Sequence, residues 1–548
     1  MRNKKSFYPL LAVIVIASMA LAACGAPEPT QPPVATEPPA TEPPATEVPA
    51  TEPPATKPAA PAAEEGVLVI GTTDKATVLD AGEAYSMIDG EIIRNTADGL
   101  LNFTPGTTDL EPGLAKDFPE VSDDGLEYTF HLVEGAKFPD GTPFNAEAVK
   151  WTIDRVAALQ RAPHWMVTAY VDRIEVVDEY TVKFVLLAPV NYWPLLLTTP
   201  TYAPASPNCY SEDAIDPDST CGGLGPYKIT KWERDVELVL EAYDGYPGKP
   251  PKTPKIIEKF YADSTTLRLA LENGEIDVAS RTLHPADYAD LEAGGKMQIC
   301  RAFSPFMRFM GFHQNVAPFD KKEVRQAIAY AVDRDAIVST AFQGTHEPLY
   351  SPVPKGMWSH IDTFPKRDLE KAKELLSAAG YDKDNKLVMD LWWTPAHYGP
   401  AEADLATVLN DNLEETGMIE VNLKNLEWAT FIDYREAGSL PAHILGWFPD
   451  YPDSDNYTWP WAHSTKSNQK MFYANPKMDE LLEAGQRVTD LHSAERKTIY
   501  EDIQRLWAED IITIPLTQGT QMVVTQPNVR GVEFDQNMRL ELFMLYKE

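Results

Sequence analysis

The chain has 548 residues with 82 acidic and 48 basic side chains, and its formal net charge is −34. This surplus argues against nucleic acid as a partner, because binding to phosphates requires clustered lysine and arginine, and against adsorption of the folded protein to anionic lipid. Hydrophobic residues make up 44% of the chain and aromatic residues 10%, enough for a large packed core. The length corresponds to about three domain-sized units.

The first 24 residues have the layout of an export signal. Three basic residues precede an apolar stretch over 7–20, which is short for a membrane-spanning helix. Cys24 directly follows Leu-Ala-Ala, and this resembles a bacterial lipobox, in which the cysteine is lipidated. We predict a lipoprotein signal peptide over 1–23 and a protein anchored through Cys24 on the extracytoplasmic side of the cell membrane. A plain secretory signal is the alternative.

Residues 24–65 combine this cysteine with a Pro/Thr/Glu-rich linker, in which "ATEPP" recurs. Proline fixes φ and removes backbone donors, so such a segment favours polyproline II and cannot pack a core. We expect a spacer between the lipid anchor and a folded body that begins at residue 66.

Three cysteines remain after Cys24. Oxidation is permitted outside the cytoplasm, and Cys209 and Cys221 flank a short polar stretch. We predict a disulfide between them and a buried free thiol at Cys300. No spacing of cysteine and histidine resembles a zinc site, and we expect no metal or other cofactor.

Strand-like and helix-like segments alternate along the body. "VLVIGTTD" from Val67 is typical of a strand, and "GLEYTFHLVEGAKF" predicts another, with Tyr128, Phe130 and Leu132 on one face. A helix is predicted to start after Asn145 as its N-cap. "DVELVLEAY" predicts a further strand, and "STTLRLALENGEIDVA" a helix, a turn and a strand.

Two later helices carry clear end signals. "FDKKEVRQAIAYAVDRDAIV" is predicted to be capped by Asp320, with Glu323 completing a capping box. "DLEKAKELLSAAGY" is predicted to end at Gly380. The alternation indicates α/β lobes rather than a helical bundle or an all-β sandwich.

Five strings, in this order, resemble the family 5 extracellular solute-binding proteins, the oligopeptide- and dipeptide-binding components of ABC importers. They are "SDDGLEYTFHLVEGAKFPDGTPFNAEAVKW", "GLGPYKITKWERDVELVLEAYDGY", "PFDKKEVRQAIAYAVDRDAIV", "GWFPDYPDSDNYTW" and "NPKMDELLEAGQRVTDLHSAERKTIYEDIQRLWAED".

The resemblance implies an α/β fold, a two-lobe clamshell of the type II periplasmic binding proteins with an extra small subdomain in the N-terminal lobe. Lobe I would comprise 66–309, with the inserted subdomain, and a return over 518–548; lobe II would comprise 310–517. It also implies a monomeric, non-enzymatic protein that captures a small solute by lobe closure and delivers it to ABC permease subunits in the membrane.

The family pattern places a ligand-binding aspartate at Asp450, where a carboxylate would accept hydrogen bonds from a peptide's α-ammonium group. A simple turn aspartate is the alternative, because turn residues surround it. Nearby Asp453 and Asp455 are interpreted as residues of turns on the lobe surface rather than calcium ligands.

Other positions implied by the resemblance would line the ligand. Trp428 and Trp447 would supply aromatic walls, and extended backbone near Thr77–Leu79 and Gly446–Phe448 would pair with a peptide. The residues that complete this predicted site are Thr77, Val78, Gly446, Phe448, Arg435 and His397.

Two arginines of the family pattern are missing. Ile444 stands where one is expected, and "WWTPAHYGP" offers His397 instead of the other. Arg435 remains as a possible anion partner, although it could equally be a surface helix residue.

Three functions compete. Peptide binding is preferred. Oligosaccharide binding on the same scaffold is the alternative, because six of the 12 tryptophans fall between Trp392 and Trp461. A secreted hydrolase is a distant third, since the chain has no Gly-x-Ser-x-Gly elbow and no His-Glu-x-x-His pair.

Overall fold

The computed structural model describes residues 66–548 with the exception of residue 396. The predicted signal peptide, the lipid anchor at Cys24 and the linker lie outside the described residues. Among the residues described, no helix combines the length and the apolar character that crossing a membrane would require.

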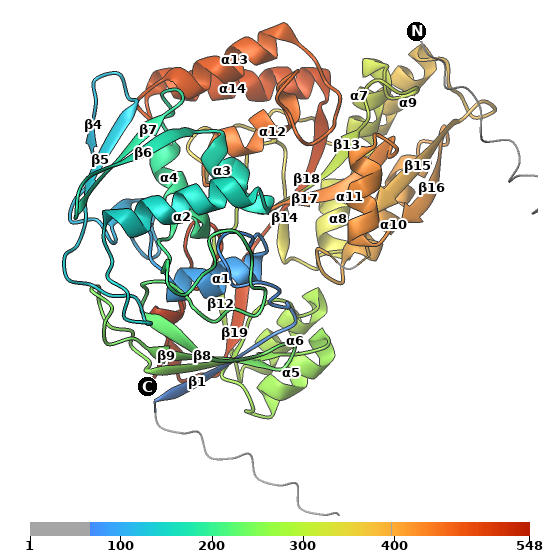
Figure 1. The fold of residues 1–548 in the computed structure, drawn as a ribbon. Helices are drawn as coiled ribbons and strands as arrows, with labels where there is room; N and C mark the ends of the chain where they lie inside the picture. Colours follow the sequence, from blue (N-terminus) through green and yellow to red (C-terminus); the bar gives the residue numbers. More distant parts are fainter. Residues whose placement is uncertain (1–65, 396) are drawn as a thin grey trace, which may run out of the picture. The chain divides into compact units, whose positions relative to one another are not determined.

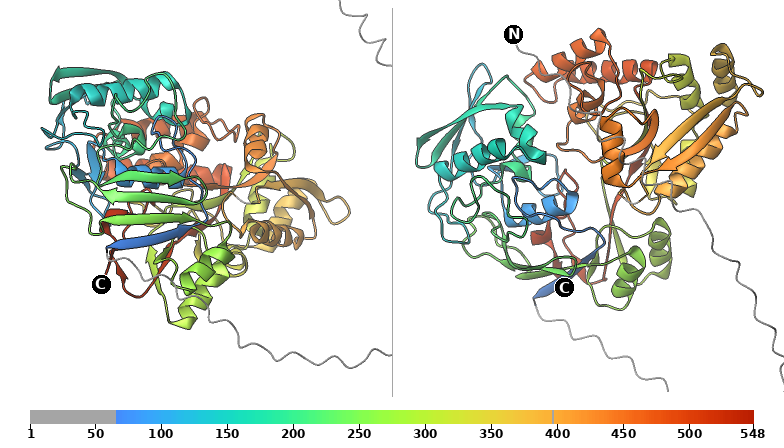
Figure 2. Two further views of the ribbon diagram at one scale, coloured as in Figure 1. Left: turned by 60° about the horizontal axis from the view of Figure 1, so that its bottom comes forward. Right: turned by 45° about the vertical axis from the view of Figure 1, so that its right-hand side comes forward.

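A seven-stranded mixed sheet brings both ends of the folded chain together (Figures 1 and 2). β1 is parallel to β10 and β11, whereas β19 runs antiparallel to β11 and β12. The strands in sheet order are β12 (Gln298–Ala302), β19 (Gln521–Thr525), β11 (Val278–Ala279), β1 (Val67–Thr72), β10 (Lys255–Phe260), β9 (Glu237–Ala242) and β8 (Tyr227–Glu233).

A six-stranded sheet is built from the second half of the chain. Its order is β14 (His346–Pro348), β18 (Thr513–Gly519), β13 (Met307–Phe312), β17 (Ala442–Trp447), β15 (Leu387–Trp393) and β16 (Ile419–Asn425). The chain passes between the two larger sheets twice, between residues 302 and 307 and between residues 519 and 521. The lobe boundaries at 309 and 517 stay predictions.

A four-stranded antiparallel sheet has its own apolar core, in which Trp193 contacts the rings of Tyr128 and Phe184 at centroid distances of 4.7 and 5.2 Å. Its strands in order are β4 (Glu120–Val121), β5 (Glu127–His131), β7 (Thr181–Leu186) and β6 (Val171–Asp178). The two small sheets are β2 (Leu101–Phe103) with β3 (Leu110–Pro112), and β20 (Val529–Arg530) with β21 (Tyr546–Lys547).

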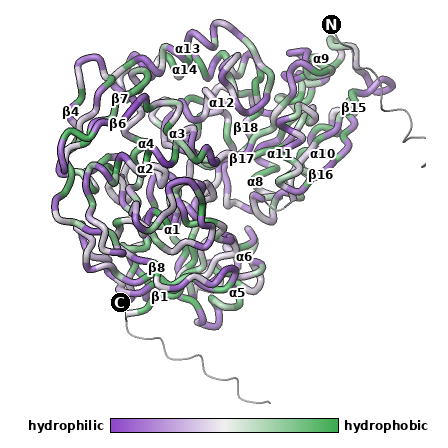
Figure 3. Tube along the Cα trace, viewed as in Figure 1, coloured by the Kyte–Doolittle hydropathy of each residue, from purple (hydrophilic) through white to green (hydrophobic). Residues whose placement is uncertain are grey.

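The helices cover these sheets, and polar and apolar residues alternate along them (Figure 3). They are α1 (Met87–Thr96), α2 (Ala146–Leu159), α3 (Trp165–Thr168), α4 (Trp193–Leu196), α5 (Ser264–Glu272), α6 (Pro285–Gly294), α7 (Lys322–Ala331), α8 (Arg334–Thr340), α9 (Leu369–Ala378), α10 (Glu402–Glu414), α11 (Trp428–Glu436), α12 (Trp459–Ala462), α13 (Pro476–Arg487) and α14 (Ala494–Asp510).

Most local predictions are confirmed. The side chain of Asn145 accepts a hydrogen bond from the Ala148 amide at 3.0 Å and so caps α2. The predicted cap at Asp320 is wrong: α7 begins later, with Lys321 at the N-cap position and no side-chain cap. Asp320 belongs instead to the preceding turn, where its amide donates to the carbonyl of Val316.

A disulfide joins Cys209 to Cys221. Cys300 carries a free thiol but is only half-buried, less than expected from the sequence. The reason is its position in β12, which is the edge strand of the seven-stranded sheet.

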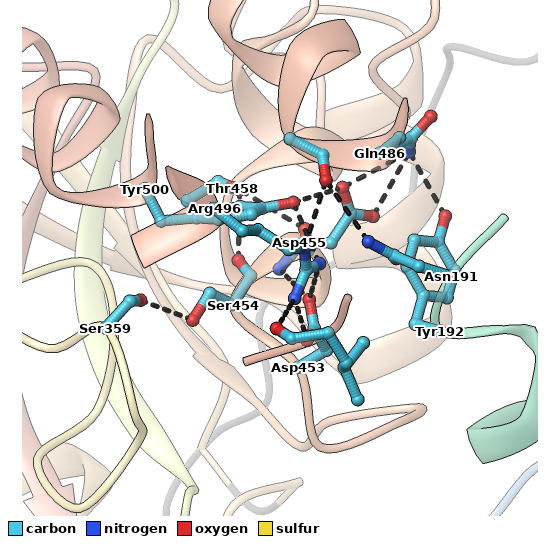
Figure 4. Close-up of polar contacts among 12 residues, drawn as sticks. Asn191, Tyr192, Ser359, Asp453, Ser454, Asp455, Thr458, Gln486, Arg496 and Tyr500 are labelled. Carbon is cyan, nitrogen blue, oxygen red and sulfur yellow. Dashed lines mark hydrogen bonds and ion pairs between the residues drawn. The ribbon is translucent and has the colours of Figure 1, made fainter. Parts of the chain in front are cut away.

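Asp453 and Asp455 are not surface residues, and the prediction that they lie in surface turns is wrong. Both are buried, and both belong to the turn 450–456, which runs into a short 3-10 helix over Ser454–Tyr457. Figure 4 shows Arg496 of α14 reaching Asp453, with its two terminal nitrogens 2.8 and 2.7 Å from the carboxylate oxygens. Arg496 thereby neutralises the negative charge of Asp453, which would be costly to bury without a partner.

Asp455 accepts hydrogen bonds from three side chains. The Tyr451 hydroxyl donates at 2.8 Å, the Tyr500 hydroxyl at 3.0 Å and the Gln486 amide at 3.2 Å. Burial, followed by the negative charge of Asp453, raises the pKa of Asp455 to about 6. The turn 450–456 is therefore held by the Asp453–Arg496 ion pair and by the hydrogen bonds that Asp455 accepts.

Replacing Asp453 by alanine is expected to lower the free energy of unfolding by about 3–5 kcal/mol, because Arg496 would remain buried without its carboxylate. Asp502→Ala is the matched control on α14, since Asp502 pairs with Arg505 and both side chains are about half exposed. Its expected cost is below about 1 kcal/mol. Urea unfolding measures the free energy of unfolding of both variants. Equal losses would contradict the stabilising role of the buried Asp453–Arg496 pair.

The raised pKa of Asp455 predicts a pH-dependent stability. A carboxyl with a higher pKa in the folded state stabilises the fold fully below its unfolded pKa of about 3.8, and this contribution is lost as pH rises through about 6. Relative to Asp455→Asn, the wild type should lose on the order of 3 kcal/mol between pH 4 and pH 7. Unfolding curves measured across this pH range test the prediction. If the stabilities of wild type and Asp455→Asn changed in parallel with pH, the raised pKa of Asp455 would be refuted.

Candidate functional site

The end of β17 leaves one strand edge unpaired. β17 pairs with β13 over its whole length, from Ala442 to Trp447, but with β15 only at His443. Among the described residues, no strand lies beside the following residues on the β15 side. The carbonyl of Gly446 on β17 accepts a hydrogen bond from the hydroxyl of Tyr398 at 3.0 Å. The Tyr398 hydroxyl occupies this one carbonyl, and the rest of the edge could be approached by a ligand's own backbone.

Gly446 is required by its surroundings. A Cβ atom at this position would lie 2.3 Å from a terminal nitrogen of Arg308 and 2.9 Å from the rings of Phe306 and Tyr398. The absence of a side chain lets the arginine pass across the strand.

Asp450 follows β17 and is half-buried. Its Oδ1 accepts a hydrogen bond from the Tyr85 hydroxyl at 2.6 Å, and its Oδ2 accepts one from the Asn456 amide at 3.2 Å. A carboxylate offers about four acceptor positions, and these two hydrogen bonds occupy two of them. Burial raises the pKa of Asp450, against the opposing hydrogen bonds from Tyr85 and Asn456 and the charge of Arg539. A cationic group beside this carboxylate would be stabilised.

Asn456 orients the aspartate. Its Oδ1 accepts hydrogen bonds from the Asp450 amide at 2.9 Å and from the Trp447 indole at 3.0 Å. With the oxygen occupied in this way, the amide nitrogen points to the carboxylate of Asp450. Asn456 was not predicted, because a buried asparagine among turn residues carries no distinct sequence signal.

Tyr85 brings the N-terminal part of the chain to this site. It directly precedes Ser86, the N-cap of α1, and 48% of its surface is exposed. Its hydroxyl bridges to Asp450 across 365 residues of sequence, a separation that no local pattern could reveal.

Aromatic rings surround the end of β17. His397 stacks on Trp428 with ring centroids 3.5 Å apart, and Phe448 stacks on Phe306 at 4.1 Å. Trp447 packs edge-on against Trp461 at 4.7 Å. The structure thus places His397, Trp428, Trp447 and Phe448 at one end of the six-stranded sheet.

Arg308 was missed from the sequence. It is buried in β13, forms an ion pair with Glu402 at 2.6 Å and donates to the carbonyl of Tyr398 at 2.9 Å. Its guanidinium carbon lies 4.3 and 4.2 Å from the ring centroids of Phe306 and Tyr398. An arginine inside an apolar strand was the available signal, and it holds the loop with His397 and Tyr398 beside Gly446.

Thr77 and Val78 lie near α1, and their backbone amides donate to Asp89 at 2.8 and 3.4 Å. The carbonyl of Thr77 accepts from Arg234 at 2.8 Å. Arg435 is bound by the protein itself, to Gln469 at 2.7 Å and to Glu436 at 3.0 Å. The ligand roles predicted for these residues stay predictions.

Comparisons with known proteins identify the family of this chain. Residues 109–469 match the family described as "Bacterial extracellular solute-binding proteins, family 5 Middle". The chain is 27% identical over 490 residues to a probable D,D-dipeptide-binding periplasmic protein of Escherichia coli, covering 87% of this chain and 93% of that protein. It is 29% identical over 468 residues to the heme-binding protein A of Haemophilus influenzae, covering 79% and 83%.

Among solved structures, a dipeptide-binding protein of a Pseudoalteromonas species in complex with Met-Leu aligns with a TM-score of 0.77 at 24% identity, covering 88% of this chain and all of that chain. The fold is accordingly the mixed α/β periplasmic-binding-protein fold, as the sequence predicted. The chain belongs to the bacterial extracellular solute-binding proteins of family 5, which are non-enzymatic substrate-binding proteins of ABC transporters.

Proposed function

We propose that this protein captures peptides outside the cytoplasm and delivers them to the permease subunits of an ABC importer. One observation carries the proposal: the Asp450 carboxylate lies next to the unpaired edge of β17. An α-ammonium group would bind the carboxylate through charge-assisted hydrogen bonds. The peptide backbone that follows would lie along Gly446–Phe448.

The relatives support a peptide more than another solute class. A D,D-dipeptide is named for one relative and Met-Leu for one solved structure, although heme is named for another relative. A free amino group adjoining a peptide backbone matches both features of this site, the carboxylate and the strand edge.

The oligosaccharide alternative rests on exposed tryptophan faces, to which sugar rings would stack. All six tryptophans between Trp392 and Trp461 are buried or half-buried, and one face of Trp428 is covered by His397. We therefore favour peptides. The anchor at Cys24 and the linker to residue 65 complete the proposal, since they would keep the binding protein beside the permease.

Asp450→Asn is expected to weaken binding of a pooled library of tetrapeptides with free amino termini by roughly ten- to a thousandfold, because a buried ammonium would lose its counter-charge. Isothermal titration measures the change. The same library with acetylated amino termini should bind weakly to the wild type and show no further loss in the variant.

Asp433→Asn is the matched control, because Asp433 is exposed on α11 and should leave affinity unchanged. Equal affinity of wild type and Asp450→Asn for the free-amine library would remove Asp450 from the ligand site. Binding of xylo- or malto-oligosaccharides in place of peptides would overturn the proposed substrate class.

A further inference from the structure

The loop that follows β7 reaches across to α13. The side-chain amide of Asn191 donates to the carbonyl of Gly485 at 3.4 Å and to the carbonyl of Val488. The hydroxyl of Tyr192 accepts a hydrogen bond from the Gln486 amide at 3.1 Å. Figure 4 shows Asn191 and Tyr192 lying together beside Gln486. The four-stranded sheet's core is thereby joined to a helix nearly 300 residues later in the chain.

The same glutamine contacts the turn 450–456. The Gln486 amide nitrogen lies 3.2 and 3.3 Å from the two carboxylate oxygens of Asp455. The ring of Tyr192 stacks on that of Tyr451 with centroids 4.7 Å apart and planes inclined by 10°. Tyr192 is fully buried and Tyr451 is 3% exposed, so both contacts are shielded from water and stronger than surface contacts.

Only a few covalent bonds separate these contacts from the ligand site. Asp455 is followed by Asn456, whose amide orients the Asp450 carboxylate. Tyr451 follows Asp450 directly. A displacement of Gln486 or Tyr192 would therefore remove contacts from the turn that carries Asp450, at Asp455 and at Tyr451 respectively.

We propose that Tyr192 and Gln486 are positioning residues for ligand binding, which lock the turn 450–456 in its binding geometry without touching the ligand. We name these contacts the latch: the hydrogen bonds of Asn191 with residues 485 and 488, the hydrogen bond between Gln486 and Tyr192, and the contacts of Gln486 with Asp455 and of Tyr192 with Tyr451. The inference rests on the proposed function, since it assigns Asp450 to the ligand. Without the latch, the turn can leave this geometry while a ligand is bound, and the affinity falls.

The latch holds the turn in place both with and without a ligand, and its loss would let a bound ligand leave more easily, so the effect should appear in the dissociation rate. Gln486→Met keeps the length of the side chain and removes its donors, and Tyr192→Phe removes only the hydroxyl. Each should raise the dissociation rate of the tightest-binding tetrapeptide of the library by about 3- to 30-fold, the effect of losing one or two buried hydrogen bonds. The association rate should change by less than about twofold.

Stopped-flow fluorescence measures both rates. Gln326→Met is the matched control, because the amide of Gln326 also donates to another helix, at the carbonyl of Glu509 and 3.1 Å away, but lies outside the latch. Both variants remove the hydrogen bond between Gln486 and Tyr192, although Tyr192→Phe also removes a contact to the Tyr170 hydroxyl. The double variant should therefore lose less than the sum of the two single variants. Additive losses, an unchanged dissociation rate or an equal effect of Gln326→Met would each overturn the latch.

A failure of the proposed peptide function can be distinguished from a failure of the latch. If the wild type binds no tetrapeptide, the peptide proposal fails, and the latch is judged by hydrogen exchange of the ligand-free full-length protein. Gln486→Met should then speed exchange in both 187–197 and 449–458, and Gln326→Met in neither. Unchanged exchange in these two segments would overturn the latch as well.

Discussion

The buried ion pair between Asp453 and Arg496 is the interaction on which the proposed ligand site depends. It holds one end of a short turn inside the protein, where a carboxylate alone would be excluded. With this end fixed, Asp455 reaches Tyr451, Tyr500 and Gln486. Asn456 can then hold Asp450 at the surface of the site. A single turn thus contains a structural carboxylate, a titratable carboxyl and the proposed ligand carboxylate.

The other half of the site depends on Arg308. This arginine lies across β17 at the one position without a side chain, Gly446, and it is paired with Glu402 on α10. Because Arg308 also binds the carbonyl of Tyr398, it fixes the loop whose aromatic residues adjoin the strand edge. Arg308 stands opposite Gly446 in the register of β13 and β17, and Asp450 follows the end of β17.

The sequence predicted much of the fold, and several of the residues it proposed for the site lie together in the structure. Strands and helices with strong periodicity, such as those at Val67 and Asn145, were predictable because their burial pattern is local. The roles of Asp453 and Asp455 were not, because their burial depends on Arg496, which lies 43 residues beyond Asp453. Tyr85 and Arg308 were missed for the same reason: their partners, Asp450 and Glu402, are distant in sequence. Asp450 itself was found only through a resemblance, since aspartate in a polar segment ordinarily indicates a turn.

The proposed site would bind a free amino group at Asp450, beside an unpaired strand edge. Native mass spectrometry of the purified full-length protein, followed by denaturation and identification of what is released, tests this binding mode. We expect the release of peptides with free amino termini. Release of compounds with hexose- or pentose-spaced masses and no amino group would contradict it.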